Sequence, residues 1–420
     1  MTYFFTLLDD SLRPRGSRDP LGLELIWAGV GRRMIGNLTT VTAQLDNFTF
    51  ALLGFHFARD ERGVPQWERF QCFEQLTGYA RAQLGRADGL LGRRKIRQQQ
   101  DLDPLPFGAR AQAAILDNQR QAGMWGLYAS ALEASGLLGR ERRATPEGLT
   151  MAGRLAPGKA PAWLGKAFDP ASAGMSQAEF AQVVDSVRGW LRPRAARRAL
   201  ADWLLAGGAQ APEMQQVLKE RAQAYLGADG QACSVRRFLA SLQDAPGPLQ
   251  AYARRVEQID HVCIFANVVF YGILGCHGKD RAAIVRDHLA PLGAWPGMEQ
   301  LRLPAFPEVK GRHWAERARR LGLFAAAMAR GDHAGALDAL VGHHEAVATA
   351  RGGAPWCHWE DGVLKVVSSG AAKAWPARQD LAEDFEAWAE PRTMDFFLGS
   401  FLAVMQQSTF DGRQPGAAAP

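Results

Sequence analysis

RQAGMWGLYASALEASGLLGRERRATPEGLTMAGRL, residues 120–155, carries the clearest order of structural signals in the chain. Leu127, Ala131 and Leu132 have the spacing of one apolar helix face, and Ser135-Gly136 offers a place for that helix to end. A basic turn follows at 139–143. Thr145 and Pro146 then have the residue types of an N-cap and a first helical position. The stretch therefore predicts a helix over 123–135, a basic turn and a second helix.

This order of elements resembles the recognition helix, wing and following helix of a winged-helix domain. The matching residues are Gly136-Leu137-Leu138, the arginines of the turn, and Thr145-Pro146-Glu147-Gly148. The resemblance implies a winged-helix domain over about residues 105–155, and such domains bind either nucleic acid or other proteins. The turn between Leu138 and Arg143 is only about four residues long. It departs from the longer wings that enter a minor groove.

Basic residues are the main argument for a nucleic-acid partner. The 420-residue chain has a net charge of +6, and Arg binds phosphate through a planar fork of donors. Solvated helix faces and a GC-rich genome are the alternative explanations for so many arginines. The candidate phosphate-binding residues are Arg93, Arg94, Lys95, Arg97, Arg120, Arg140, Arg142, Arg143, Arg194, Arg197 and Arg198. Because no aromatic residue interrupts these clusters, a stacking platform for single strands is not expected.

The helix expected at 123–135 has few side chains that could read bases. Its polar residues are Ser130, Glu133 and Ser135, whereas Arg, Asn and Gln make most specific base contacts. Gln119, Arg120 and Gln121 come just before the helix. We therefore expect duplex nucleic acid to be bound mainly through its phosphates, with weak sequence preference.

The remainder of the chain is typical of a mainly α protein. We expect a winged-helix-containing helical domain at 1–152 and a second helical domain at 176–410. The stretch 153–175 is rich in Pro, Gly and Ala and predicts a linker or an extended crossing of the surface. WCHWEDGVLKVVSS, near 356–368, has the pattern of a small β-hairpin. The tail at 411–420 is expected to be disordered.

Three features favour a cytoplasmic protein without a membrane partner. The five cysteines include no CxxC pair, so no disulfide framework is indicated. The first twenty residues lack the basic start and long apolar core of a signal peptide. The apolar run at 262–275 contains Asn267 and is shorter than the roughly 20 residues that a membrane span needs. A buried central helix explains it better.

No familiar catalytic motif is present in the sequence. It contains no Walker A sequence, no GxSxG and no HExxH, and no GxGxxG follows a strand. The alternative to a binding protein is a metal-dependent, nuclease-like enzyme that uses residues of 343–365. Its candidate ligands are His343, His344, Glu345, Cys357, His358, Glu360 and Asp361, with Lys365 nearby. Adjacent histidines diverge on a helix, and the carboxylate usual two positions before the Lys is missing. We therefore expect no metal and no cofactor.

The preferred hypothesis is a non-enzymatic nucleic-acid-binding or scaffold subunit of a larger bacterial complex. PLGLELIWAGVGRRMIGNLTT, at residues 20–40, followed by the winged-helix-like segment, resembles uncharacterised proteins from bacterial phage-defence loci. That resemblance implies a role in antiviral defence and other protein subunits as partners.

Overall fold

The computed structural model describes residues 19–63, 65–208, 212–229, 234–293, 298–368, 372–375 and 385–409. Over these residues the protein is mainly helical, with two small antiparallel sheets of two strands each. The expected class, a mainly α protein with a small hairpin, is confirmed. The tail at 411–420 lies outside the described residues.

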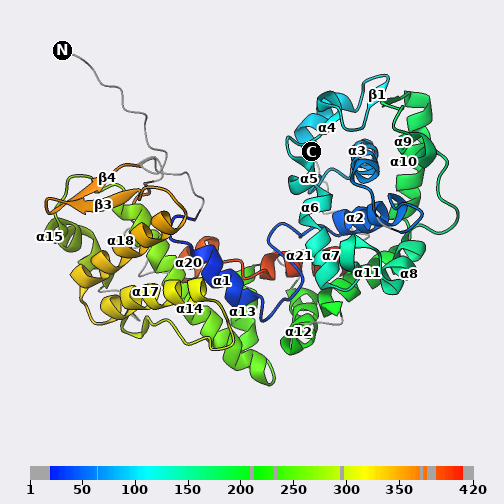
Figure 1. Ribbon diagram of the computed structural model, residues 1–420. Helices are drawn as coiled ribbons and strands as arrows, with labels where there is room; N and C mark the ends of the chain where they lie inside the picture. The colour runs from blue at the N-terminus through cyan, green and yellow to red at the C-terminus, as the bar shows by residue number, and fades with distance from the viewer. Residues whose placement is uncertain are drawn as a thin grey trace, which may run out of the picture. The chain divides into compact units, whose positions relative to one another are not determined.

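The chain forms two compact units, and each takes residues from two separate parts of the sequence (Figure 1). Unit 1 comprises Met1–Arg33 and Ser234–Phe396, and unit 2 comprises Met34–Cys233 and Phe397–Pro420. This division differs from the expected domains at 1–152 and 176–410. The reason is that α1 (Leu23–Gly31) packs on helices from the second half of the chain, which local sequence signals do not reveal.

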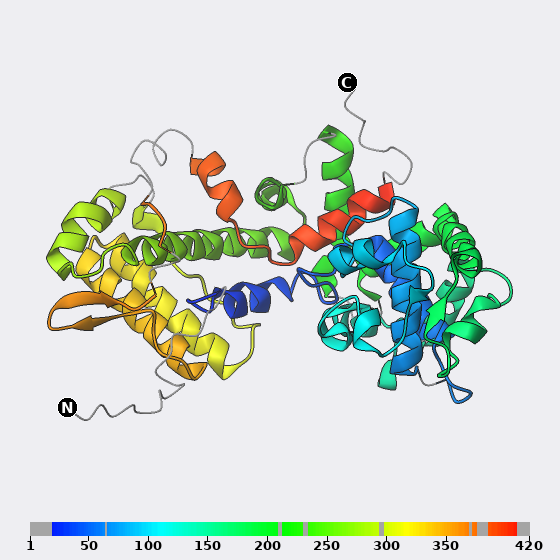
Figure 2. The same cartoon turned by 90° about the horizontal axis from the view of Figure 1, so that it is seen from above.

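Unit 1 is built around the long helix α14 (Pro248–Ile273), which contacts α1, α17 (Arg312–Ala329) and α18 (His333–Ala350). Figure 2 shows α14 running along this unit. Pro248 opens the helix at a position where the missing N–H costs nothing. The other helices of unit 1 are α13 (Val235–Ser241), η5 (Leu242–Asp244), α15 (Arg281–Ile284), η6 (Val285–Leu289), α16 (Ala290–Gly293), η7 (Met298–Gln300), α20 (Phe385–Ala389) and η8 (Glu390–Arg392).

The apolar run at 262–275 lies within α14 and is largely buried, which confirms the expected central helix. In the part of the chain that the structure describes, no helix is long and apolar enough to cross a membrane.

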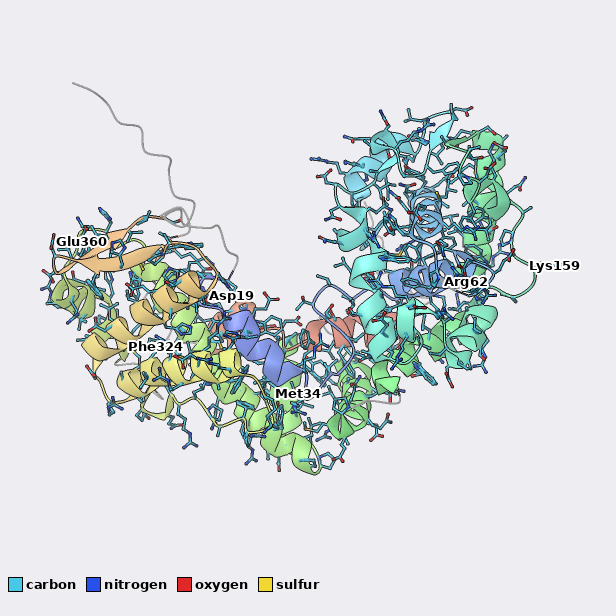
Figure 3. The ribbon with its side chains drawn as sticks, in the orientation of Figure 1. Asp19, Met34, Arg62, Lys159, Phe324 and Glu360 are labelled. Atoms are coloured by element: carbon cyan, nitrogen blue, oxygen red, sulfur yellow. The ribbon has the colours of Figure 1, made fainter. Side chains whose placement is uncertain are left out.

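The hairpin of unit 1 is formed by β3 (Cys357–Glu360) and β4 (Val363–Val366) and confirms the prediction for 356–368. Glu360, labelled in Figure 3, ends β3 opposite Val363. Asp361 and Gly362 close the turn with positive φ angles of 49° and 78°. Gly takes such angles without a steric cost, and Asp tolerates them better than most residues.

Unit 2 has α2 (Leu45–Phe57) and α3 (Trp67–Gln83) at its centre, both buried over most of their length. Its other helices are α4 (Arg93–Gln99), η2 (Ala111–Ala113), α5 (Gln119–Ala122), α6 (Met124–Leu127), α7 (Ala129–Ala134), η3 (Arg140–Arg142), α8 (Pro146–Leu155), α9 (Trp163–Ala167), α10 (Gln177–Leu191), α11 (Arg194–Ala206), α12 (Glu213–Asp229) and α21 (Leu398–Thr409). β1 (Leu105–Pro106) pairs with β2 (Gly174–Met175).

The stretch 153–175 is part of unit 2, although its Pro and Gly content predicts a linker. Trp163 and Leu164 of α9 are buried, and the ring of Trp163 stacks on Phe73 of α3 with a centroid distance of 6.3 Å. These buried apolar side chains hold the stretch against α3. Its backbone is irregular, as in a linker, but the stretch is packed on unit 2 instead of being exposed to solvent.

Candidate nucleic-acid interface

The segment that resembles a recognition helix is divided into short helices. α5 ends at Gly123, whose backbone is extended, and α6 begins at the next residue. A Cβ atom at Gly123 would lie 2.4 Å from the carbonyl oxygen of Gln119 and 2.8 Å from the carboxylate of Glu74, so only Gly fits this bend. The expected single helix over 123–135 is therefore formed by α6 and α7, with Tyr128 between them.

A buried carboxylate fixes the bend. Glu74, on α3, accepts a hydrogen bond of 2.6 Å from the Met124 amide at the start of α6 and one of 2.8 Å from the Gln119 side chain. Burial raises the pKa of Glu74 to about 7, against the effect of these two donors. The start of α6 is thus attached to the core of unit 2.

The basic turn after α7 is closed by a single pair of bridging residues, Leu138 and Ala144. The Gly139 amide donates to the carbonyl oxygen of Arg143 at 2.7 Å, while Glu141 and Arg142 adopt positive φ angles of 57° and 60°. Thr145 then caps α8 by accepting a hydrogen bond from the Gly148 amide at 3.1 Å, as predicted. Over the described residues, the turn carries a bridge and a 3₁₀ turn rather than two strands.

Arg142 is held against Trp125 rather than pointing freely into solvent. Its Cζ atom lies 4.7 Å from the centroid of the Trp125 ring, and Nη1 donates to the Trp125 carbonyl oxygen at 3.0 Å. Burial lowers the pKa of Arg142, the Glu133 carboxylate opposes this shift, and Arg120 lowers the pKa further. Arg120 is therefore close enough for its charge to act on Arg142.

A surface groove of about 680 Å³ lies between these residues. Its lining comprises Arg120, Gln121, Trp125, Gly126, Glu141 and Arg142. Arg120 and Arg142 bring like charges to one groove, and an anion between them relieves their repulsion. One carboxylate, that of Glu141, also lines the groove and pairs with Arg143 at 2.9 Å. The lining therefore keeps a net positive charge and has the donors to hold a phosphate group.

Two further arginines lie on the basic turn, next in the sequence to residues that line the groove. Arg140 and Arg143 are exposed on the turn, and Arg143 pairs with Glu141 at 2.9 Å. That pair is solvent-exposed on both sides and is therefore weak. The structure thus brings together the predicted Arg120, Arg140, Arg142 and Arg143.

The cluster on α4 lies next to the same region. Arg93, Arg94 and Arg97 are exposed, while Ile96 is buried and fixes the helix to α3. Lys95 pairs with Asp117 at 2.7 Å, which places α4 against the segment that leads into α5. In Figure 1, α4, α5 and α6 follow one another down one side of unit 2.

The third predicted cluster is only partly on the surface. Arg194 and Arg198 are exposed on α11, and neither lines the groove. Arg197 is only 3% exposed and forms an ion pair of 2.5 Å with Asp46 on α2. The assignment of Arg197 as a phosphate-binding residue is therefore corrected: its guanidinium group is an internal partner of Asp46.

Two histidines of the alternative, metal-dependent site form hydrogen bonds within unit 1. His344 uses both ring nitrogens: Nδ1 donates to the Pro20 carbonyl oxygen at 3.0 Å, and Nε2 accepts from the Trp356 amide at 2.7 Å. His343 donates through Nε2 to the Leu21 carbonyl oxygen at 2.7 Å. Among the described residues, no three His, Cys, Asp or Glu side chains are close enough together to share a metal ion.

Sequence reasoning missed the aromatic residues beside the arginines. Besides the Arg142–Trp125 contact, the Arg120 guanidinium lies 6.0 Å from the centroid of the Trp67 ring. Trp125 lies between Arg120 and Arg142 in the sequence, so its position was a usable signal. Trp67 is distant in the sequence and reaches the arginines only because α3 packs there. Trp125 is only 8% exposed, so its ring is part of the groove wall rather than a stacking platform.

Comparison with models of protein families, with curated proteins and with solved structures finds no match to this chain.

Proposed function

We propose that unit 2 binds nucleic acid through its phosphate groups, at the groove formed by α5, α6 and the basic turn. The observation that supports this most is the convergence of Arg120 and Arg142 on one groove. Both can donate paired N–H groups to phosphate oxygens. The exposed cations at Arg140, Arg143 and along α4 extend the positive surface beyond the groove.

Weak sequence preference is part of the proposal. On α7, Ser130 and Glu133 are exposed, but Ser135 is buried and bonded to the side chain of Asn37 at 2.8 Å. The helix thus offers even fewer base-reading side chains than the sequence predicts. Duplex contact would then depend on phosphates, as in other positively charged surfaces that follow a nucleic-acid backbone.

Within this proposal, α7, the turn and α8 correspond to a reduced winged helix, in which the wing is a single closed turn. The protein would act without chemistry of its own, as a nucleic-acid-binding or scaffold subunit of a larger bacterial complex in the cytoplasm. Antiviral defence is the role that the sequence resemblance implies, and other subunits would bind elsewhere on the molecule.

Fluorescence anisotropy with a short labelled duplex of random sequence tests the proposal directly. We expect binding at low salt, with a log–log slope of affinity against salt of about −0.9 per phosphate contacted. A duplex of a second, unrelated sequence should bind with an affinity within about tenfold of the first, because phosphates carry no base information. Absence of binding at low salt would overturn the proposal and make the basic turn a protein-docking element.

The control is a surface arginine away from the groove. Arg62, labelled in Figure 3, follows α2 and pairs only weakly with its neighbour Asp60, since its side chain is 81% exposed. Replacing Arg62 by Ala removes the same charge as replacing Arg120. If both variants lose the same affinity, net charge rather than the groove explains binding.

A further inference from the structure

Three arginines surround one aspartate inside unit 2. Asp46, in the first turn of α2, is paired with Arg197 of α11 at 2.5 Å and with Arg86, just after α3, at 3.2 Å. Arg81 of α3 is close enough for its charge to act on the same carboxylate. Burial raises the pKa of Asp46, but the charges of Arg197, Arg81 and Arg86 outweigh this effect and the net shift is downward. Asp46 is therefore ionised.

Arginine charges act on both carboxyl groups of this region. Arg remains protonated in proteins, so Arg197, Arg81 and Arg86 keep their charges beside Asp46. Glu74 also acts on Arg81, but burial raises the pKa of Glu74 to about 7, so this carboxyl group is only partly ionised near neutral pH. Glu74 therefore carries only part of a full negative charge beside Arg81.

Arg81 has the strongest requirement for a further partner. It is only 1% exposed, and its Nη1 donates to the Asn47 side chain at 2.7 Å. Its Nε and Nη2 atoms are buried and have no hydrogen-bond partner among the described residues. These two atoms form one edge of the guanidinium plane, so their N–H groups point in nearly the same direction. The face of the plane is covered by Phe50, with Cζ 5.1 Å from the ring centroid.

An edge of two parallel N–H groups is the arrangement with which Arg binds an anion bidentately. Leaving both groups buried without a hydrogen-bond partner opposes folding. One negatively charged acceptor at this edge would accept a hydrogen bond from each of them. It must be small, because Arg81 and Arg197 together leave almost no surface accessible to solvent.

We propose that unit 2 binds one small inorganic anion at the Nε–Nη2 edge of Arg81, with the neighbouring charges of Arg86 and Arg197 contributing to its affinity. Arg86 has a side chain that is 42% exposed, so the cluster reaches the surface at this residue. The site is distinct from the groove, whose lining includes none of these residues. It ties α2, α3 and α11 together and does not depend on the proposed nucleic-acid binding.

Thermal unfolding in different sodium salts at constant ionic strength tests this site without nucleic acid. Chloride and phosphate are the two probes, and gluconate, which is too large to enter, is the reference anion. We expect Tm to rise and then saturate with chloride or phosphate, by roughly 5–10 °C at a hundred times the Kd. The probe that acts at lower concentration identifies the preferred anion.

Variants assign the effect to Arg81. Arg81→Lys keeps the charge but loses the two-donor edge, so the anion-dependent rise in Tm should disappear. Arg120→Ala and Arg62→Ala should both keep the rise, because neither residue belongs to the cluster. A rise that persists in Arg81→Lys, or the same Tm in all three salts for the unaltered protein, would overturn the proposal.

Crystals of the unaltered protein soaked in bromide give a readout that does not require a variant to fold. The proposal expects an anomalous peak within hydrogen-bond distance of Nε and Nη2 of Arg81. If Tm responds to phosphate alone, the same test is made with arsenate, whose arsenic atom also gives an anomalous signal. If Tm responds to chloride, a bromide-soaked crystal without a peak at Arg81 would contradict the proposal. If Tm responds to phosphate alone, an arsenate-soaked crystal without that peak would contradict it.

Discussion

The guanidinium group of Arg142 lies 4.7 Å from the centroid of the Trp125 ring and also donates a hydrogen bond to that residue's carbonyl oxygen. The Arg142 side chain therefore has two roles: it lines the groove, and it connects the basic turn to α6 through Trp125. A loss of binding on removing Arg142 could therefore come from either role. Arg120, Arg140 and Arg143 are more exposed and allow a cleaner test of charge.

Replacing Arg142 by Ala should destabilise unit 2 by about 1–2 kcal/mol, because the contact over the ring and the hydrogen bond are both lost. Urea unfolding followed by tryptophan fluorescence measures this difference. Arg140→Ala, on the same turn but without such contacts in the described structure, should stay within about 0.5 kcal/mol of the unaltered protein. Equal stability of the two variants would show that the Arg142–Trp125 contact contributes nothing.

Replacing Arg120, Arg140 and Arg143 together by Ala should weaken duplex binding equally for unrelated sequences. Each lost phosphate contact should flatten the salt dependence by roughly one unit of slope. The triple variant should keep the melting temperature of the unaltered protein, since these three side chains lie on the surface. The measurement is anisotropy across a salt series. An unchanged slope would mean that these arginines do not touch phosphate.

Leu132→Asp should unfold unit 2. Leu132, on α7, is fully buried and would place an unpaired charge in the core, at a cost of several kcal/mol against a typical stability of roughly 5–15. Leu149→Asp makes the same change at a position on α8 that is 39% exposed. Thermal unfolding of both variants, followed by circular dichroism, measures the difference in stability. A Leu132→Asp variant as stable as the Leu149→Asp variant would contradict the packing of α7.

His343 should make unit 1 less stable in acid. Burial lowers the pKa of His343 to about 4, while the hydrogen bond to Leu21 opposes that shift. Because the unfolded chain binds the proton more readily, stability is fully present above about pH 6.5 and is lost as the pH falls toward 4. The full effect is at most about 3 kcal/mol. A His343→Gln variant, compared by urea unfolding at pH 7 and pH 4.5, should lose less stability in acid than the unaltered protein. An equal loss in both would exclude His343 as the cause.

The sequence signals that succeeded are local. The Thr145 cap, the Asp361-Gly362 turn and the apolar run of α14 each depend on residues within a few positions, and the structure confirms all three. Local signals were also sufficient to gather Arg120, Arg140 and Arg142 in one region, since all belong to one short stretch.

The features that could not be predicted depend on distant partners. Arg197 is buried because Asp46, 151 residues away in the sequence, offers it a carboxylate. Its neighbours Arg194 and Arg198 carry the same charge and remain exposed, so residue type did not distinguish them. The stretch 153–175 has the composition of a linker, and only the contact of Trp163 with Phe73 shows that it belongs to unit 2.

The discontinuous make-up of the two units has a consequence for biosynthesis. Unit 1 combines α1 with the helices of 234–396, and unit 2 combines the helices of 34–233 with α21. Gln407 of α21 accepts a hydrogen bond from the Leu45 amide at 2.9 Å and donates one to the Ala43 carbonyl oxygen at 2.7 Å, at the start of α2. Domains usually fold in order as they leave the ribosome. Here unit 2 lacks one of its segments until α21 has been synthesised, so a nascent chain stalled before residue 398 would expose the unfinished core of unit 2 to chaperones and proteases.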